Sequence, residues 1–342
     1  MHQPLRLTCS KEALAGNWRL LAERAGVPAA AAVKADGYGL GAREVVAILA
    51  QAGCRDFLVS SWWEAAELSG VAPGAAIAVL HGLGPDDLPA AMESGARPVL
   101  NSPAQVARWR EHAPGRPCDV MIDTGMNRLG LRPDETAELA GLHIHTLHSH
   151  LACADETHAL NELQLRRFRE VASAVPAQRY SLANSAGIYL GRDFSFDLVR
   201  PGLALYGGIP RLEARGDIRQ VVRLEAQVVQ RRTILAGESC GYGATFRADR
   251  DTQAAVINIG YADGYWRGFS SIGSAEASGT KLPVIGRVSM DLVALGCDAL
   301  PTVAEGDWVE VDFTLEEAAT RSGKSQYELL TGLGRRFKRA WR

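Results

Sequence analysis

The feature that most constrains the fold is a series of eight short apolar segments, which alternate with helical patterns between residues 30 and 207. Between them, stretches such as AREVVAILAQAG and NELQLRRFREVASAV place apolar residues three and four positions apart, as amphipathic helices do. Eight strands that alternate with helices over about 200 residues favour a (β/α)8 barrel over an open α/β sheet. The expected strands are AAAVKA (30–35), DFLVS (56–60), AIAVLHGL (76–83), ARPVLNS (96–102), CDVMIDT (118–124), HIHTLHSHL (143–151), RYSLAN (179–184) and DLVRPGLALYG (197–207).

The pattern changes in the last third of the chain. VVRLEAQVVQRRTI, LPVIGRVSMDLVAL and WVEVDF alternate apolar and polar residues between glycine-rich breaks, which is typical of strands in a mostly β domain. We therefore predict a barrel domain over residues 10–215 and a mostly β domain over residues 216–342. The short apolar stretch within residues 1–9 could pair with either domain, and the sequence leaves that choice open.

Composition excludes several classes of function. The formal net charge is −2, so the chain has no electrostatic signature for binding nucleic acid or an anionic membrane. The N-terminus lacks the pattern of a secretory signal, and no apolar run is long enough to span a bilayer. The six cysteines include no CxxC pair, which argues against a disulfide framework and a structural zinc site. We expect a cytoplasmic protein without a bound metal.

The first apolar segment carries a lysine, Lys34, and is followed by the glycine-rich turn ADGYGLG. One interpretation is a dinucleotide-binding loop, because Gly37, Gly39 and Ala42 satisfy the pattern G-x-G-x-x-A. The next strand, however, begins with Asp56, whereas that fold requires an acid near the end of its second strand. This single match is therefore weak.

Two other interpretations of Lys34 remain. It could extend out of the barrel end as a structural lysine, or pair with Asp36. It could instead be a Schiff-base lysine, because the carboxyl ends of barrel strands form active sites and burial leaves an amine nucleophilic. The ends of the other strands carry polar groups suited to an anionic ligand with an aromatic ring. These groups are Arg128, His150, Asn184, Ser185, Arg200 and Gly202.

Nine motifs then occur in the order found in alanine racemases, and the sequence resembles that family over almost its whole length. The resemblance implies a pyridoxal 5′-phosphate (PLP) barrel, a C-terminal β domain, and a head-to-tail homodimer whose active sites use residues from both chains. The motifs are AVKADGYGLG, MIDTGMNRLG, HSHLACADE, LANSAG, VRPGLALYG, CGYGATF, IGYADG, GRVSMD and SQYELL.

The resemblance also implies which residues bind the cofactor. Lys34 resembles the lysine that carries PLP, and Arg200 resembles the arginine that faces the pyridine nitrogen. An arginine cannot accept a proton, so that nitrogen should stay unprotonated and the cofactor should be a weaker electron sink. His150 either supports Arg200 or is a structural histidine at the barrel end. The remaining cofactor-binding residues are Tyr38, Asn184, Ser185, Gly202, Leu203 and Tyr327, with the phosphate taken by hydroxyls and backbone N–H groups.

Racemisation removes a proton from one face of the α-carbon and delivers one to the other face. Lys34 is the expected base on one face, and Tyr242 in GYGATF resembles the base that a partner chain supplies on the other. Arg128 and Met290 resemble substrate-binding residues, the latter through its backbone N–H. Tyr261 resembles an entrance residue that restricts the pocket to small side chains.

One position departs from the family pattern. Many members have a lysine seven residues before the motif arginine, and its carbamylation offsets the charge of that arginine. Here Met121 occupies this position, and a thioether cannot be carbamylated. Because a partly buried, uncompensated guanidinium is costly, we expect an anion beside Arg128. Chloride is favoured, with Asp123 or Asn127 as alternatives.

Several functions therefore remain open. The leading hypothesis is a racemase acting on alanine, and a racemase of broader specificity that includes serine is its closest rival. A PLP-binding protein without turnover is disfavoured, because such a protein needs no base like Tyr242. A related decarboxylase would need a cysteine near the substrate, for which Cys240 is only a faint indication. A dinucleotide-dependent oxidoreductase comes last.

Overall fold

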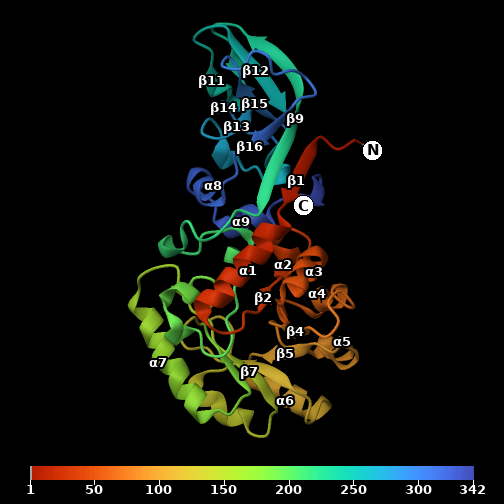
Figure 1. Cartoon of the computed structure of the whole chain (residues 1–342), viewed down its shortest axis with the longest axis vertical. Helices are drawn as coiled ribbons and strands as arrows, with labels where there is room; N and C mark the ends of the chain where they lie inside the picture. The colour runs from red at the N-terminus through yellow and green to blue at the C-terminus, as the bar shows by residue number, and fades with distance from the viewer. Residues whose placement is uncertain (1) are drawn as a thin grey trace. The chain divides into compact units, whose positions relative to one another are not determined.

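The computed structural model describes residues 2–342 and divides into two compact units (Figure 1). We call Ala13–Arg219 the parallel unit. The second, the β unit, combines the N-terminal residues up to Glu12 with Gln220–Arg342. No helix among residues 2–342 is both long and apolar enough to cross a membrane.

The parallel unit is built on one sheet of seven strands that follow each other in chain order. All neighbouring strands are parallel, and β6 is buried at each of its positions, as expected for a sheet covered on both faces. The α/β alternation predicted from the sequence is thus confirmed. The strands are β2 (Ala31–Ala32), β3 (Asp56–Val59), β4 (Ala76–Val79), β5 (Arg97–Leu100), β6 (Cys118–Met121), β7 (Ile144–His148) and β8 (Arg179–Ser181).

The eighth predicted strand, residues 197–207, does not form a ladder. Single parallel bridges join Val199 to Ala29 and Arg200 to Asn184, so this segment contacts both ends of the seven-stranded sheet. Pro201 follows and has no N–H to donate, and the chain then turns into a short 3₁₀ helix, Leu203–Tyr206. The segment therefore lies where an eighth strand would lie, with only two bridged residues.

Helices connect the parallel strands, and in Figure 1 they lie around the sheet. Local signals explain where they begin and end. Before α6, Ser102 accepts the backbone N–H of Gln105, and Pro103 occupies the first turn. Gly53, with a φ of 116°, ends α3. The helices are α1 (Lys11–Ala25), α2 (Lys34–Tyr38), α3 (Ala42–Ala52), α4 (Trp62–Glu67), α5 (Leu88–Glu93), α6 (Pro103–His112) and α7 (Ala159–Ala174).

The β unit contains a sheet of eight strands in the order β12-β15-β14-β13-β16-β9-β1-β17. The long strand β9 also pairs with β12, so the ladder that starts at β12 returns to β9. The N-terminal strand β1 pairs with β9 and with the C-terminal strand β17, which makes it part of this unit. The strands are β1 (Leu5–Cys9), β9 (Val222–Ile234), β12 (Thr252–Ile257), β13 (Ser274–Ala277), β14 (Thr280–Ile285), β15 (Val293–Gly296), β16 (Trp308–Val311) and β17 (Lys338–Trp341).

Three smaller elements of the β unit complete the fold. A two-stranded ribbon, β10 (Ser239–Cys240) with β11 (Phe246–Arg247), extends the chain between β9 and β12. Two helices, α8 (Leu315–Ser322) and α9 (Gln326–Thr331), follow β16. Ser325 and Glu328 form a capping box at the start of α9.

Candidate active site

Lys34 stands at the start of an unusual turn. Strand β2 ends at Ala32, and the residues after Lys34 adopt left-handed backbone angles, with φ of 53° at Ala35, 55° at Asp36 and 55° at Tyr38. Gly37, at 62°, is the glycine among these four residues. A left-handed conformation costs a non-glycine residue roughly 1–2 kcal/mol, so the surrounding structure must hold this turn in place.

Two carboxylates hold the turn. Asp36 Oδ1 accepts the backbone N–H of Ala42 at 2.8 Å, which ties the turn to the start of α3. Glu64, on α4, accepts the N–H of Ala35 at 2.7 Å with one oxygen and the N–H of Ser60 at 2.6 Å with the other. No motif in the sequence singles out Glu64 as a site residue.

Lys34 is half-buried and follows strand β2 after one intervening residue, Val33. Burial lowers its pKa below that of an ordinary lysine, and the positive charge of Arg128 lowers it further. The negative charge of Glu64 acts in the opposite direction. Lys34 is therefore more readily neutral than a surface lysine, which suits a nucleophile or a base.

Next to this turn lies a cradle of hydroxyl and backbone groups. Buried Ser185 accepts the N–H of Gly202 at 2.8 Å and that of Ala204 at 3.3 Å, so its own hydroxyl hydrogen is directed elsewhere. A Cβ atom at Gly202 would collide with the hydroxyl of Tyr38, so only glycine lets the backbone pass so close to this phenol. Leu203 continues from Gly202 into the 3₁₀ helix. These residues suit an anionic group such as phosphate.

Neighbouring contacts fix the two sides of the cradle. The ring of Tyr38 stacks on Tyr206 with centroids 4.5 Å apart, and the Tyr206 hydroxyl donates to the Ala32 carbonyl at 2.8 Å. Asn184 uses its side-chain oxygen to accept the N–H of Gly187 at 2.9 Å. Asn184 therefore shapes the turn that carries the adjacent Ser185.

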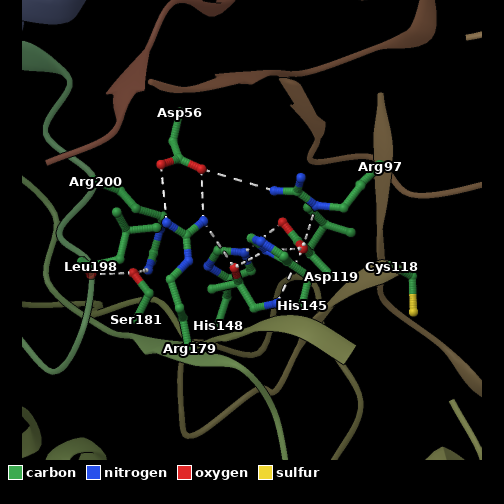
Figure 2. A network of polar contacts seen from close by, with 12 residues as sticks. Asp56, Arg97, Cys118, Asp119, His145, His148, Arg179, Ser181, Leu198 and Arg200 are labelled. Carbon is green, nitrogen blue, oxygen red and sulfur yellow. Dashed lines mark hydrogen bonds and ion pairs between the residues drawn. The ribbon is translucent and has the colours of Figure 1, made fainter. Parts of the chain in front are cut away.

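Arg200 is the buried cation of this site, with only 6% of its surface exposed. Its guanidinium donates to the Ser181 hydroxyl, and both residues are labelled in Figure 2. It also donates to the carbonyls of Ser149 and Leu182. Burial lowers its pKa to about 10, so the group stays charged at neutral pH. Its described hydrogen bonds involve no carboxylate.

The role of His150 stays a prediction. The described hydrogen bonds of Arg200 do not include His150, so direct support from this histidine is not observed. Burial and the charges of Arg200, Arg128 and Lys34 lower the pKa of His150 to about 3. His150 is therefore a neutral imidazole near three cations.

Beyond Arg200, the interior of the parallel unit holds a network of charges, drawn in Figure 2. Asp119, only 1% exposed, accepts from Arg97 at 3.0 Å and pairs with His148 at 3.3 Å. Asp56 binds Arg179 through two hydrogen bonds of 2.7 and 3.0 Å. In the sequence, this network is indicated by Asp119, a carboxylate inside the apolar stretch CDVM. Its role was not predicted.

The protonation states of this network are set by burial and pairing. Burial alone would raise the pKa of Asp119, but hydrogen bonds from His145 and His148 and the charge of Arg97 lower it well below its usual range. Burial lowers the pKa of His148 to about 4 despite its bond to Asp119. Asp119 is thus a fixed anion, and His148 is neutral at physiological pH.

The other predicted residues lie in the β unit, and most are exposed. Tyr242, in the turn between β10 and β11, is 66% exposed, Met290 is 53% exposed and Tyr327 on α9 is 49% exposed. The Arg287 guanidinium lies next to this turn, because a Cβ atom at Gly243 would be 3.0 Å from its Nη1.

Tyr261 and Met290 belong to loops that are locked together. The N–H of Tyr261 donates to the Ser289 carbonyl at 3.1 Å, and the Met290 carbonyl accepts from Ala262 at 3.0 Å. Buried Asp263 braces the first of these loops, because it binds Arg336 through hydrogen bonds of 2.6 and 2.7 Å. Asp263 was also missed from the sequence, although it lies in the IGYADG motif.

Arg128 does not have the partly buried surroundings that were expected from the sequence. Arg128 is exposed in the single chain, and it makes no ion pair with the described carboxylates. Asp123 accepts only backbone N–H groups, including that of Arg128 at 3.2 Å. Met121 is buried against Ala78 and Val99. The cost of an uncompensated buried guanidinium is therefore absent in one chain, and chloride binding stays a prediction for an assembly that covers Arg128.

The predicted site residues are thus distributed over the two units. The parallel unit brings together Lys34, Tyr38, Ser185, Arg200 and Gly202, whereas Tyr242, Tyr261, Met290 and Tyr327 belong to the β unit. Within residues 2–342, no group of three or more His, Cys, Asp or Glu side chains is arranged to hold a metal ion. A half-buried lysine, a phosphate cradle and a buried arginine define the site of a PLP-dependent enzyme.

Comparison with known proteins identifies the family. Residues 9–210 match the model described as alanine racemase, N-terminal domain, and residues 221–341 match alanine racemase, C-terminal domain. The chain belongs to the alanine racemase family. The expected family, enzyme class and cofactor are thereby confirmed.

Individual relatives match over nearly the whole chain. A catabolic alanine racemase of Agrobacterium fabrum is 44% identical, covering 98% of this chain and 91% of its own, and the alanine racemase of Rhizobium meliloti is 42% identical, covering 98% and 96%. The crystal structure of alanine racemase from Bartonella henselae with covalently bound pyridoxal phosphate covers 100% of both chains, with 37% identity and a TM-score of 0.93.

Proposed function

We propose that this protein interconverts L-alanine and D-alanine with PLP held on Lys34. The observation that carries the proposal is a half-buried lysine of lowered pKa beside a cradle of hydroxyl and backbone groups. The Bartonella henselae relative, which contains covalently bound pyridoxal phosphate, supports the same cofactor. In the cell, such an activity would supply D-alanine for peptidoglycan precursors.

The residues of the parallel unit fit this cofactor. Ser185, Tyr38 and the backbone at Gly202 and Leu203 would hold its phosphate, with Tyr327 as a further contact. Arg200 would face the ring nitrogen as a donor, since its guanidinium is charged and cannot accept a proton. When bound, PLP supplies an electron-withdrawing ring that acidifies the α-proton of an attached amino acid.

Two bases would then exchange the proton. Lys34 serves one face of the substrate α-carbon, and its lowered pKa makes the neutral amine accessible. Tyr242 serves the opposite face. The guanidinium of Arg287 lies beside Gly243, the residue that follows Tyr242 in the chain.

The substrate is held by its carboxylate and restricted by its side chain. Arg128 offers an exposed guanidinium close enough to Lys34 to influence its charge, and the backbone N–H of Met290 is a second donor. Tyr261, half-buried in the loop beside Met290, narrows the space for the side chain. A methyl group fits this description better than a long side chain.

We further propose a homodimer whose active sites combine the parallel unit of one chain with the β unit of another. The exposed side chains of Tyr242, Met290 and Tyr327 support it, because apolar groups of this size gain from being covered. A closed (β/α)8 barrel over residues 10–215 is supported by the two bridges at Val199 and Arg200. The cytoplasmic location stays a prediction.

The test is incubation of the purified protein with L-alanine, L-serine and L-lysine, followed by chiral analysis of the products. We expect D-alanine to form fastest. Equal rates for serine would favour the racemase of broader specificity. Borohydride reduction and peptide mapping should place the pyridoxyl group on Lys34, and finding it on another lysine would contradict the assignment.

A further inference from the structure

Glu64 joins two neighbouring strand ends of the parallel unit. One of its oxygens accepts the N–H of Ala35, directly after Lys34, and the other accepts the N–H of Ser60, directly after β3. Its own backbone N–H donates to Ser61, which caps α4. A single carboxylate on a capped helix thus connects the lysine turn to the adjacent strand.

One of the two hydrogen bonds of Glu64 is made to the left-handed turn that follows Lys34. Ala35 is the first of the consecutive left-handed residues after Lys34, and its side chain gives no reason for that conformation. At the far end of the turn, Asp36 bonds Ala42. Loss of the Glu64 bond would leave the end next to Lys34 without its side-chain acceptor.

We propose that Glu64 is a positioning residue for Lys34, whose carboxylate both fixes the left-handed turn that presents the amine and places a negative charge near it. This inference deepens the proposed function and rests on Lys34 being the residue that binds PLP. Glu64 bonds the backbone beside the reacting lysine and has no assigned contact with substrate.

The charges around Lys34 support an electrostatic part in this role. Arg128 and burial disfavour the ammonium form of Lys34, and Glu64 favours it. His150 is neutral and adds no positive charge, and one carboxylate oxygen of Asp36 already accepts the N–H of Ala42. Glu64 is therefore the anion that limits how far the pKa of Lys34 is lowered.

Three variants separate the two parts of the role. Glu64→Gln removes the charge and one of the two acceptors, since an amide nitrogen cannot accept an N–H. Glu64→Asp keeps the charge but shortens the side chain, so it cannot span both N–H groups. Glu67→Gln makes the same chemical change as Glu64→Gln at an exposed position of α4 and serves as the matched control.

The measurement uses the full chain freed of cofactor. The acetylation rate of Lys34 is followed against pH by peptide mass spectrometry, and the rate of PLP uptake by absorbance. For Glu64→Gln we expect the midpoint of the pH profile to fall by about one pH unit or more and uptake to slow about tenfold. Glu64→Asp should slow uptake with a smaller shift of the midpoint, and Glu67→Gln should match the wild type.

The inference is overturned if Glu64→Gln and Glu67→Gln give the same pH midpoint for acetylation and the same rate of PLP uptake. If Glu64→Gln does not fold, Glu64→Asp decides the geometric part, because uptake at the wild-type rate would then contradict it. Borohydride mapping of the wild type is the separate check on the proposed function. If PLP is found on Lys34 but the Glu64 variants keep the wild-type pH midpoint and uptake rate, only this inference fails. If PLP is found on another lysine, the proposed function fails.

Discussion

The two halves of the candidate active site are built in opposite ways. In the parallel unit, Arg200 is 6% exposed and Ser185 is 3% exposed, and both make several hydrogen bonds with their surroundings. In the β unit, Tyr242 is 66% exposed and stands in a short turn between two-residue strands. One half is formed within its own unit, and the other presents side chains that a single unit does not cover.

This difference has a consequence for stability and function. A change at a buried, hydrogen-bonded side chain such as Arg200 or Ser185 removes contacts that hold the fold as well as groups proposed to hold the cofactor, so it should affect both. A change at an exposed side chain of the β unit should affect activity and leave the free energy of unfolding unchanged within about 0.5 kcal/mol. Variants in the two units should therefore separate loss of activity from loss of stability.

The largest effect is expected from Lys34→Ala. Lys34 is assigned both the link to PLP and one proton transfer, and a proton transfer alone contributes about 10²–10⁴-fold. We therefore expect racemisation to fall by at least about 10⁴-fold and the visible absorbance band to be lost. The free energy of unfolding should not decrease, because burial disfavours the charged amine. Residual activity above one hundredth of wild type would contradict this role.

Tyr242→Phe should lower racemisation by about 10²–10⁴-fold without a change in urea unfolding. Because Lys34 would still serve its own face, exchange of the α-proton with solvent should survive from one enantiomer and fail from the other. The two exchange rates are measured separately in deuterium oxide by NMR. Equal slowing for both enantiomers would mean that Tyr242 only shapes the pocket.

Asp119→Asn should destabilise the fold by about 1.5–3 kcal/mol, because it removes the buried carboxylate 3.0 Å from Arg97 and leaves that guanidinium only Asp56, at 4.0 Å. The matched control is Glu310→Gln in the β unit, whose 2.7 Å pair with Arg223 is exposed and worth about 0–1 kcal/mol. The free energy of unfolding of each variant is measured by urea unfolding under the same conditions and compared with the wild type. A loss below 1 kcal/mol for Asp119→Asn would show that the buried half does not depend on this network.

Acidification should destabilise the protein through its buried histidines. His148 has a folded pKa of about 4 against an ordinary value of 6.5, so between these values the unfolded chain binds more protons. Stability should therefore fall as the pH drops from about 6.5 to about 4, by about 1.4 kcal/mol per pH unit for His148. His148→Asn should reduce this slope, whereas His112→Asn, at an exposed position of α6, should keep it. An unchanged slope in His148→Asn would contradict the assignment.

Motif residues were predictable, whereas the structure that supports them was not. Lys34, Ser185 and Gly202 stand in stretches whose residue types already indicate a lysine at a strand end and a close backbone approach. The left-handed angles at Ala35 and Tyr38 were hidden, because these residue types avoid that conformation and the surrounding bonds impose it.

Long-range pairing accounts for the other omissions. Asp119 is separated from His148 by 29 positions, and Glu64 from Ala35 by 29, so no local pattern links either pair. The exact start and end of the strands were also not readable, since β2 keeps only two of the six residues in AAAVKA. Alternation and motif order thus predict the fold class, while bonds between distant positions decide the detailed geometry.

In the proposed homodimer, the buried half of one chain works with the exposed half of another. Inactive Lys34→Ala and Tyr242→Phe chains are mixed under conditions where subunit exchange is shown independently, and racemisation is measured. Random mixed dimers would contain one intact site each, so activity should recover to about one quarter of the wild-type value. No recovery, despite proven exchange, would mean that each active site is built from a single chain and would rule out the shared sites.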